Sequence, residues 1–243
     1  MTAVRVVVGP LTRLGRRVGT GEGTRLVARH DADAKALADL GAGTVVRADE
    51  RDPAVLVGTG DGPVEVVVCA LGPIHPDEPD SARDTEAYRR DLDLLAAVVD
   101  AAGPRPLHVV LVSTVVAIAP GEDRRYYGGW KALVEQDLAG LLARRAPSAR
   151  LSVLYPGRIL DAADRSRPWH RLHATYDAVA ARVEATLGQA RHELVGLDAR
   201  LWVLTRSLSL LLTVLRPRGS RAALTTAETS PATEASSPTE RAL

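Results

Sequence analysis

Short apolar runs rich in valine and leucine alternate along the chain with longer segments of helical composition. Residues 64–70 and 107–113 have the apolar content expected of strands that are buried on both faces of a sheet. Alternation of strands with helices predicts an α/β fold, a doubly wound, mostly parallel sheet with helices on both faces. Further strands are predicted at residues 4–8, 24–28, 44–46 and 151–155, and helices at residues 33–40, 85–102, 125–145, 175–188 and 198–215.

Three parts are expected along the chain. A Rossmann-like domain covers residues 1–160, and a small helical C-terminal cap covers residues 161–218. A disordered tail is predicted for residues 219–243, because Thr, Ser, Ala, Glu and Pro dominate there. Residues 201–215 are apolar around most of a helix, but about 15 residues are too few to span a bilayer, which needs roughly 20. We expect that helix to pack in the core or at a subunit interface.

Charge and cysteine content narrow the choice of partners. The net charge of +1 and the mixed order of basic and acidic residues argue against a nucleic-acid partner. The single Cys69 excludes an internal disulfide and offers no metal cluster, so no metal site is predicted. The first residues enter a strand pattern without a signal peptide, and a cytoplasmic location is expected.

Tyr127 and Lys131 stand four residues apart on a predicted helix, so their side chains share one face. An ammonium group near a phenol favours the phenolate and lowers the pKa of the tyrosine toward the working range of a general acid. Lysine is rare in this chain, since Lys35 and Lys131 are the only lysines among 31 basic residues. The simpler interpretation is a half-buried helix with one snorkelling lysine. The order of the neighbouring motifs favours the acid.

Other candidate residues follow successive predicted strands in a consistent order. They are Gly9 and Gly15 after the first strand, Arg29 after the second, Asp49 after the third, Ala70 after the fourth, Ser113 at the end of the fifth, and Pro156 and Gly157 after the sixth. In this order the chain resembles the short-chain dehydrogenase/reductase superfamily, in its atypical or extended, epimerase-like branch. The resemblance covers about residues 4–160. In such sheets the ligand lies at the carboxyl ends of the strands.

The resemblance implies a carbonyl reduction that three residues assist. Ser113 would hydrogen-bond the carbonyl oxygen of the substrate, and Tyr127 would give that oxygen a proton. Lys131 would lower the pKa of Tyr127 and hold the nicotinamide ribose. Reduction places negative charge on the oxygen, and two donors aimed at it stabilise that charge. Tyr126 is the alternative tyrosine, but its partner four residues on is Trp130.

The cofactor implied by the resemblance is NADP(H). Arg29 would meet its 2′-phosphate, Asp49 would lie beside the adenine, and the segment ending in Pro156 and Gly157 would flank the nicotinamide. The implied cofactor-binding residues are Gly9, Thr12, Arg13, Gly15, Arg29, Asp49, Ala70, Lys131, Pro156 and Gly157.

Two features of the glycine motif count against binding of a diphosphate. Thr12 replaces the middle glycine of Gly-x-x-Gly-x-x-Gly, where the backbone should approach the pyrophosphate closely. Residues 19–23 then contain three glycines, each of which costs about 1 kcal/mol relative to alanine in a helix. One helical turn at most is therefore expected after Gly15. Arg13, Arg16 and Arg17 could compensate by meeting phosphate directly.

Two further positions depart from the pattern of the family. Asp91 stands near the place of an asparagine that supports the lysine, so it is expected to pair with Lys131 unless the alignment shifts by one residue. His170 and His173 lie three residues apart, but the sequence places no carboxylate with them.

Three functions are compatible with these motifs. The first is an NAD(P)H-dependent ketoreductase that acts on a small to medium, apolar substrate such as a natural product. The second is a non-redox dehydratase, cyclase or isomerase, for example on a polyketide-like substrate, that uses Tyr127 and Lys131 as acid and base without nicotinamide. The third is a non-catalytic scaffold that senses a cofactor or binds a partner. The resemblance implies a homodimer through the helix that carries Tyr127.

Overall fold

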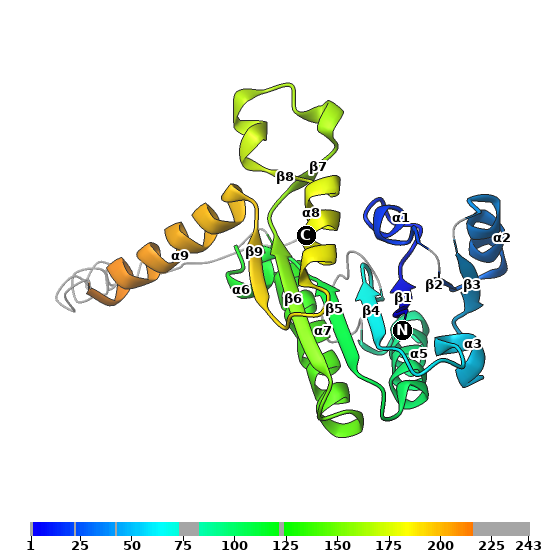
Figure 1. The fold of residues 1–243 in the computed structure, drawn as a ribbon. Helices are drawn as coiled ribbons and strands as arrows, with labels where there is room; N and C mark the ends of the chain where they lie inside the picture. The colour runs from blue at the N-terminus through cyan, green and yellow to red at the C-terminus, as the bar shows by residue number, and fades with distance from the viewer. Residues whose placement is uncertain (1, 22, 42, 73–82, 122–123, 216–243) are drawn as a thin grey trace, which may run out of the picture. The chain divides into compact units, whose positions relative to one another are not determined.

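The computed structural model describes residues 2–21, 23–41, 43–72, 83–121 and 124–215, with side chains up to residue 212 (Figure 1). Residues 1–204 form one compact unit, and residues 205–243 are assigned to a second. The boundary expected at residue 160 stays a prediction. The tail expected at residues 219–243 lies outside the described residues.

Seven parallel strands form one sheet in the order β3-β2-β1-β4-β5-β6-β9. The strand order reverses direction between β1 and β4, which is the switch point of a doubly wound fold. A separate two-stranded ladder pairs β7 with β8. The strands are β1 (Val4–Val8), β2 (Thr24–Ala28), β3 (Thr44–Arg47), β4 (Val64–Val68), β5 (Leu107–Val112), β6 (Arg150–Pro156), β7 (Ile159–Leu160), β8 (Ala174–Thr175) and β9 (His192–Val195).

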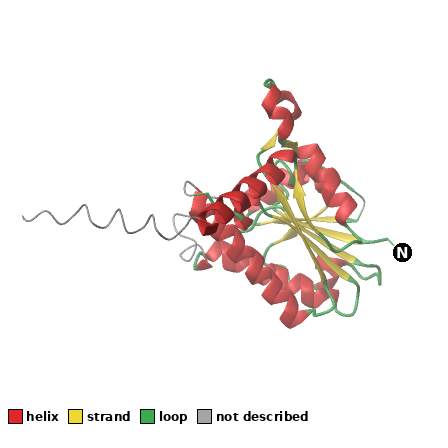
Figure 2. Ribbon diagram, turned by 90° about the vertical axis from the view of Figure 1, so that its left-hand side faces the viewer, coloured by secondary structure: helices red, strands yellow, loops and turns green. Residues whose placement is uncertain are grey.

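Helices cover both faces of the sheet (Figures 1 and 2). One face packs against α1 (Gly15–Val18), α2 (Asp31–Asp39) and α8 (Tyr176–Thr186). The other packs against α3 (Pro53–Val57), α5 (Glu86–Ala102) and α7 (Arg125–Arg145). The connections carry α6 (Val115–Ile118), η2 (Ala162–Asp164) and η3 (Pro168–Leu172), and α9 (Leu197–Leu215) follows β9. The predicted three-layer α/β fold is confirmed.

The valine-rich strands are apolar on both sides because each side meets a different layer of helices. In β1, Val6 and Val8 pack toward α3 and α5, whereas Val7 packs toward α1 and α8. These three side chains are at most 1% exposed. Full burial of one such side chain contributes about 1.5–3 kcal/mol, so the run tolerates no polar residue.

An aromatic pair fills the space between α5 and α7 on one face of the sheet. The rings of Tyr88 and Trp130 meet edge to face, with centroids 4.7 Å apart. Both side chains are almost completely buried. The Tyr88 hydroxyl donates a hydrogen bond of 2.9 Å to Asp137 on α7. In a chain without phenylalanine, this pair supplies much of the bulk that a core of valine, leucine and alanine lacks.

Part of the segment expected as a cap belongs to the main sheet. The strand β9 pairs with β6, and Val179 and Val183 of α8 lie in the same buried cluster as Val7 of β1. The sequence missed β9 because it is short and begins with His192 and Glu193, which interrupt the apolar pattern. The predicted long helices at residues 85–102, 125–145, 175–188 and 198–215 agree with α5, α7, α8 and α9 to within two residues.

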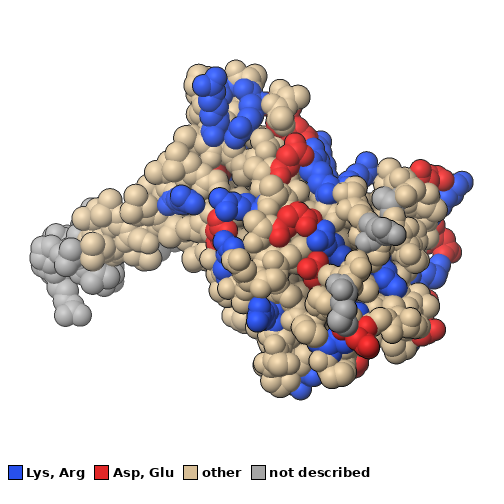
Figure 3. Space-filling view, viewed as in Figure 1, with Lys and Arg blue, Asp and Glu red and all other residues tan. Residues whose placement is uncertain are grey.

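Two further observations concern helix length and surface charge in the described part of the chain. No helix there combines the length and apolar content needed to cross a bilayer. On the face drawn in Figure 3, the described Lys and Arg side chains are interspersed with Asp and Glu rather than joined in one continuous stripe.

A buried histidine ties the amino end of β5 to the chain beside β9. The Gly188 N–H donates to His108 Nδ1 at 3.0 Å, so the ring proton lies on Nε2, which meets Ser152 Oγ at 2.9 Å. The Arg191 N–H also donates to Ser152 Oγ. Burial holds the pKa of His108 below its ordinary value, against the charge of Glu65. The folded state therefore keeps this ring neutral.

We predict that the protein loses stability in mild acid through His108. Above the unfolded pKa of about 6.5, both states are neutral. Below it, the unfolded chain takes up a proton that the folded ring resists, so the free energy of unfolding falls by at most about 1.4 kcal/mol per pH unit. Urea unfolding between pH 5 and 7.5 measures this slope, which His108→Gln should reduce. His192→Gln, at an exposed position on β9, is the control. Equal slopes in wild type and His108→Gln would contradict the prediction.

Candidate active site

The parallel sheet brings the loops after its strands to one edge. Gly9, Arg29, Ala70, Ser113 and Gly157 all lie at or just after the carboxyl ends of β1, β2, β4, β5 and β6. The sequence predicted this placement, because alternation of strands and helices makes the strands parallel, so the loops that follow them share one edge. The contacts that each residue makes at that edge differ from the expectation in several places.

The helical pairing of Tyr127 and Lys131 is present on α7. Lys131 Nζ lies 5.7 Å from the centre of the Tyr127 ring. Tyr127 is half-buried and packs against a small apolar cluster of Val115, Val116 and Ala199. The first turns of α7 therefore hold the phenol against the segment that follows Ser113.

The expected lowering of the Tyr127 pKa is not observed. Burial raises the pKa of Tyr127 above its ordinary value, and the charge of Arg124, not that of Lys131, acts in the other direction. Burial also lowers the pKa of Lys131, while the charge of Glu135 acts to raise it. Loss of water disfavours both the phenolate and the ammonium. Tyr127 is thus a protonated phenol at neutral pH, as a proton donor must be.

Glu135 is a site residue that the sequence analysis missed. The Ser113 hydroxyl donates to Glu135 Oε1 at 2.5 Å, and the Tyr155 hydroxyl donates to Glu135 Oε2 at 2.9 Å. The signal was available, because Glu135 follows Lys131 by four residues and so extends the face that Tyr127 begins. Ser113 is buried, and its proton is committed to this carboxylate.

Thr12 closes the loop after β1 upon itself. Its hydroxyl donates to the Gly9 carbonyl at 2.8 Å and accepts from the Gly15 N–H at 2.9 Å. Gly9 has a φ of +77°, and a side chain there would lie 2.9 Å from the Ala70 nitrogen. The loop thus passes close to the end of β4, as in the expected motif, but its Gly15 amide is already used.

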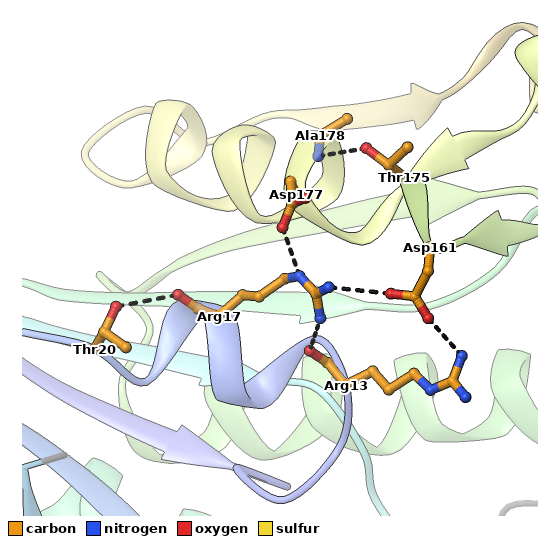
Figure 4. Close-up of polar contacts among 7 residues, drawn as sticks. All are labelled: Arg13, Arg17, Thr20, Asp161, Thr175, Asp177 and Ala178. Carbon is orange, nitrogen blue, oxygen red and sulfur yellow. Dashed lines mark hydrogen bonds and ion pairs between the residues drawn. The ribbon is translucent and has the colours of Figure 1, made fainter. Parts of the chain in front are cut away.

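The helix after this loop has one turn, as predicted. The four residues of α1 end at Val18, followed by Gly19. Arg13 and Arg17, expected as phosphate ligands, instead form ion pairs with Asp161 and Asp177 from the chain after β6 (Figure 4).

Arg29 and Asp91 form a buried ion pair at the end of β2. Arg29 donates to both carboxylate oxygens, at 3.0 and 2.6 Å, and to the Ala70 carbonyl at 3.1 Å. Asp91 is fully buried and also accepts from the Gly72 N–H at 2.9 Å. The expected pair of Asp91 with Lys131 is therefore wrong, because α5 directs Asp91 toward β2 and β4. Removal of one partner from a buried pair leaves an uncompensated charge, so this pair fixes both strand ends.

A polar depression of about 400 Å³ lies at the carboxyl ends of β2 and β3. It brings together Arg29 and Asp49, as the motif order predicted. The Asp49 carboxylate accepts from Arg47 at 3.2 Å, and this contact holds its pKa below the usual value. The lining residues are Arg29, His30, Asp31, Arg47, Asp49 and Arg90.

Asp198 lies against the end of β6. A side chain on Gly157 would lie 2.1 Å from Asp198 Oδ2, so only glycine leaves room for the carboxylate. Asp198 Oδ2 accepts from the Arg158 N–H at 2.9 Å and lies 2.8 Å from His173 Nδ1. His173 thus has a carboxylate partner, which the sequence did not indicate. In the described part of the chain, no three His, Cys, Asp or Glu side chains group around a metal-sized site.

We predict that Glu135 supports the charge of Lys131. Reductive ¹³C-methylation labels both lysines, and Lys35→Arg assigns their NMR signals. The pKa of Lys131 should lie below 10.5, and Glu135→Gln should lower it further because a nearby negative charge is lost. Asp100→Asn, on the last turns of α5, is the charge-matched control. A Lys131 pKa that is unchanged or higher in Glu135→Gln would refute this role.

Comparison with known proteins identifies the fold. No protein-family model matches the sequence, and no curated protein sequence matches it either. A solved 3-ketoacyl-(acyl-carrier-protein) reductase from Brucella melitensis, complexed with NADH, is similar with a TM-score of 0.57 and 16% identity over 81% of this chain and 98% of that one. A blue fluorescent protein from a metagenomic library, in complex with NADPH, is similar with a TM-score of 0.53 and 16% identity over 79% and 96%.

A third solved structure carries the name of the superfamily. It is a short-chain dehydrogenase/reductase of the glucose/ribitol dehydrogenase type from Brucella melitensis, similar with a TM-score of 0.52 and 14% identity over 81% of this chain and 96% of that one. At such identities the likeness concerns the fold. The parallel sheet of this protein and the large shared extent of the chains agree with these solved structures. The protein therefore has the fold of the short-chain dehydrogenases and reductases.

Proposed function

We propose that the protein is an NADP(H)-dependent oxidoreductase of the short-chain dehydrogenase/reductase superfamily, which reduces a carbonyl group on a small to medium, apolar substrate. The observation that carries this proposal is Tyr127, a protonated phenol one helical turn from Lys131, on a helix that also contacts Ser113 at the end of β5. Similar structures crystallised with NADH and NADPH support the choice of cofactor.

The residues around the sheet edge fit a dinucleotide in most places. The depression at the ends of β2 and β3 has room for an adenosine that carries a 2′-phosphate, and its three arginines outnumber the carboxylates of Asp31 and Asp49. Gly9 lets the loop after β1 pass close to Ala70 at the end of β4. The Gly15 amide is used by Thr12, so Arg13 and Arg17 must take the place of a helix N-terminus at the diphosphate.

The chain's own groups account for the proton that carbonyl reduction requires. NADPH, when bound, would supply the hydride. Tyr127 gives its phenolic proton to the carbonyl oxygen, and the charge of Arg124 favours the phenolate that is left. Because burial makes an isolated phenolate costly, the nearby cation contributes most after the proton has left. We also propose that Lys131 binds a ribose hydroxyl of the cofactor.

Ser113 acts only after an exchange of hydrogen bonds. In the structure the Ser113 hydroxyl donates its hydrogen bond to Glu135, so toward a ligand its oxygen can only accept a hydrogen bond. To donate to a carbonyl oxygen, Ser113 must turn away from Glu135, which keeps Tyr155 as a donor. Glu135 is therefore a positioning residue that sets when Ser113 becomes available.

A second candidate function is proton transfer without nicotinamide, in a dehydration, cyclisation or isomerisation. The observation that favours it is the loop after β1, in which Thr12 uses the Gly15 amide and Asp161 binds Arg13. Tyr127 would again act as acid. A polyketide-like or other natural-product substrate, the atypical branch of the superfamily, a homodimer through α7 and a cytoplasmic location all remain predictions from the sequence.

We predict that Tyr127→Phe reduces NADPH-dependent carbonyl reduction by at least about 100-fold, because it removes the proton donor. NADPH affinity, measured by cofactor fluorescence, should change little. Tyr126→Phe is the matched control, since Tyr126 is exposed and meets Arg125 rather than the site. Rates come from a panel of apolar ketones and aldehydes under saturating NADPH.

Three outcomes separate the candidates. The reductase is supported if the protein binds NADPH and turnover is lost in Tyr127→Phe but not in Tyr126→Phe. Turnover of a substrate without nicotinamide that Tyr127→Phe abolishes supports the non-redox enzyme. Absence of NADPH binding at high micromolar concentration refutes the reductase.

A further inference from the structure

The chain after β6 reaches back to the loop after β1 through four charged side chains. Asp161 precedes η2, and Asp177 lies in the first turn of α8, whose N-cap Thr175 accepts from the Ala178 N–H (Figure 4). Arg13 lies in the loop and Arg17 on α1. These elements are 144 to 160 residues apart in sequence. The contact therefore joins the loop after β1, an inner strand, to the chain after β6 at the carboxyl edge of the sheet.

The two carboxylate oxygens of Asp161 are bound by arginines in the way that phosphate oxygens would be. Its two oxygens each meet a different arginine, Arg13 Nη1 at 2.7 Å and Arg17 Nη2 at 3.1 Å. Arg17 Nε donates to Asp177 Oδ1 at 2.6 Å, and Arg17 Nη1 donates to the Arg13 carbonyl at 2.8 Å. Guanidinium groups bind carboxylate and phosphate oxygens with the same fork geometry. Two arginines and two carboxylates leave this cluster with no net charge.

The same two arginines hold a fixed place above the loop. Both guanidinium groups lie near the Tyr176 ring, with their central carbons 5.9 and 5.2 Å from its centroid. The contact of Arg17 with the Arg13 carbonyl does not involve either carboxylate. The cations are therefore positioned by the loop and the ring as well as by Asp161 and Asp177.

We propose that Arg13 and Arg17 form a diphosphate-binding site. When no nucleotide is bound, the carboxylates of Asp161 and Asp177 occupy the positions of the phosphate groups. This inference rests on the proposed function, because the diphosphate is that of a dinucleotide. Thr12 has taken the Gly15 amide, and α1 has a single turn, so the arginines are the groups left to meet the charge. Entry of the nucleotide exchanges two carboxylates for phosphate oxygens, so the ion pairs between the chain after β6 and the loop after β1 are lost, while the packing of α8 on α1 is kept.

The four side chains are exposed to solvent, so a ligand can replace the carboxylates. The side chains of Arg13 and Asp177 are 65% and 69% exposed, and those of Arg17 and Asp161 are 32% and 30% exposed. Ion pairs with such exposure are weak and are screened by salt. A diphosphate brings more charge to the two arginines than either carboxylate, so it can displace them. Burial would have prevented this exchange, as it does for Arg29 and Asp91.

The test compares NADPH with adenosine 2′-phosphate, which lacks the diphosphate. In the full-length Asp161→Asn/Asp177→Asn variant, NADPH should bind about three- to tenfold more tightly, because three weak competing ion pairs are lost. The affinity for adenosine 2′-phosphate should not change. The Arg13→Gln/Arg17→Gln variant should bind NADPH at least about tenfold more weakly, again with no change for adenosine 2′-phosphate.

Asp100→Asn is the control, since it removes a surface carboxylate that pairs with Arg145 on the far ends of α5 and α7. Circular dichroism and thermal unfolding show whether each variant folds, and Asp177→Asn alone serves if the double variant does not. NADPH affinity that is unchanged or weaker in the asparagine variants, while wild type binds NADPH, overturns this inference alone. Failure of both wild type and the asparagine variants to bind NADPH overturns the proposed cofactor and this inference together.

Discussion

Backbone hydrogen bonds join seven parallel strands, and helices bury the resulting sheet on both faces. A polar side chain inside such a sheet is costly unless it is paired, so the polar groups of this chain gather where the strands end. Ser113 and Asp91 illustrate the rule, since both are buried near that edge and both are hydrogen-bonded. The position of α7 follows from the same packing, and the Ser113–Glu135 bond joins its polar face to the end of β5.

Carboxylates hold the basic groups along this edge. Arg29 is bound by Asp91, Arg47 by Asp49, and Arg17 by Asp161 and Asp177. An anionic ligand must therefore displace these carboxylates from the arginines, because the arginines are already paired. The degree of burial decides where exchange is easy. The Arg29 pair is fixed by a fully buried carboxylate, whereas the pairs of Arg17 are open to water and salt.

Local patterns were sufficient for much of the fold and part of the site. The Tyr127–Lys131 pairing follows from helical spacing, and the single turn of α1 follows from the glycines that end it. The strand β9 was missed because a short edge strand with His192 and Glu193 carries no alternating or continuous apolar signal. Glu135 could have been found by extending the helical face of Tyr127 and Lys131 by one more turn.

The sequence by itself determined the alternation of strands and helices, the loop positions and the spacing of Tyr127 and Lys131, because these depend on neighbours within a few residues. Only the tertiary structure decided which charges meet. Asp91 binds Arg29 instead of Lys131, and Asp198 reaches His173 from 25 residues away. Such contacts depend on how each helix is rotated and packed against the sheet. The shift in the pKa of Tyr127 also depends on tertiary structure. Burial raises this pKa, and no local pattern of residues specifies burial.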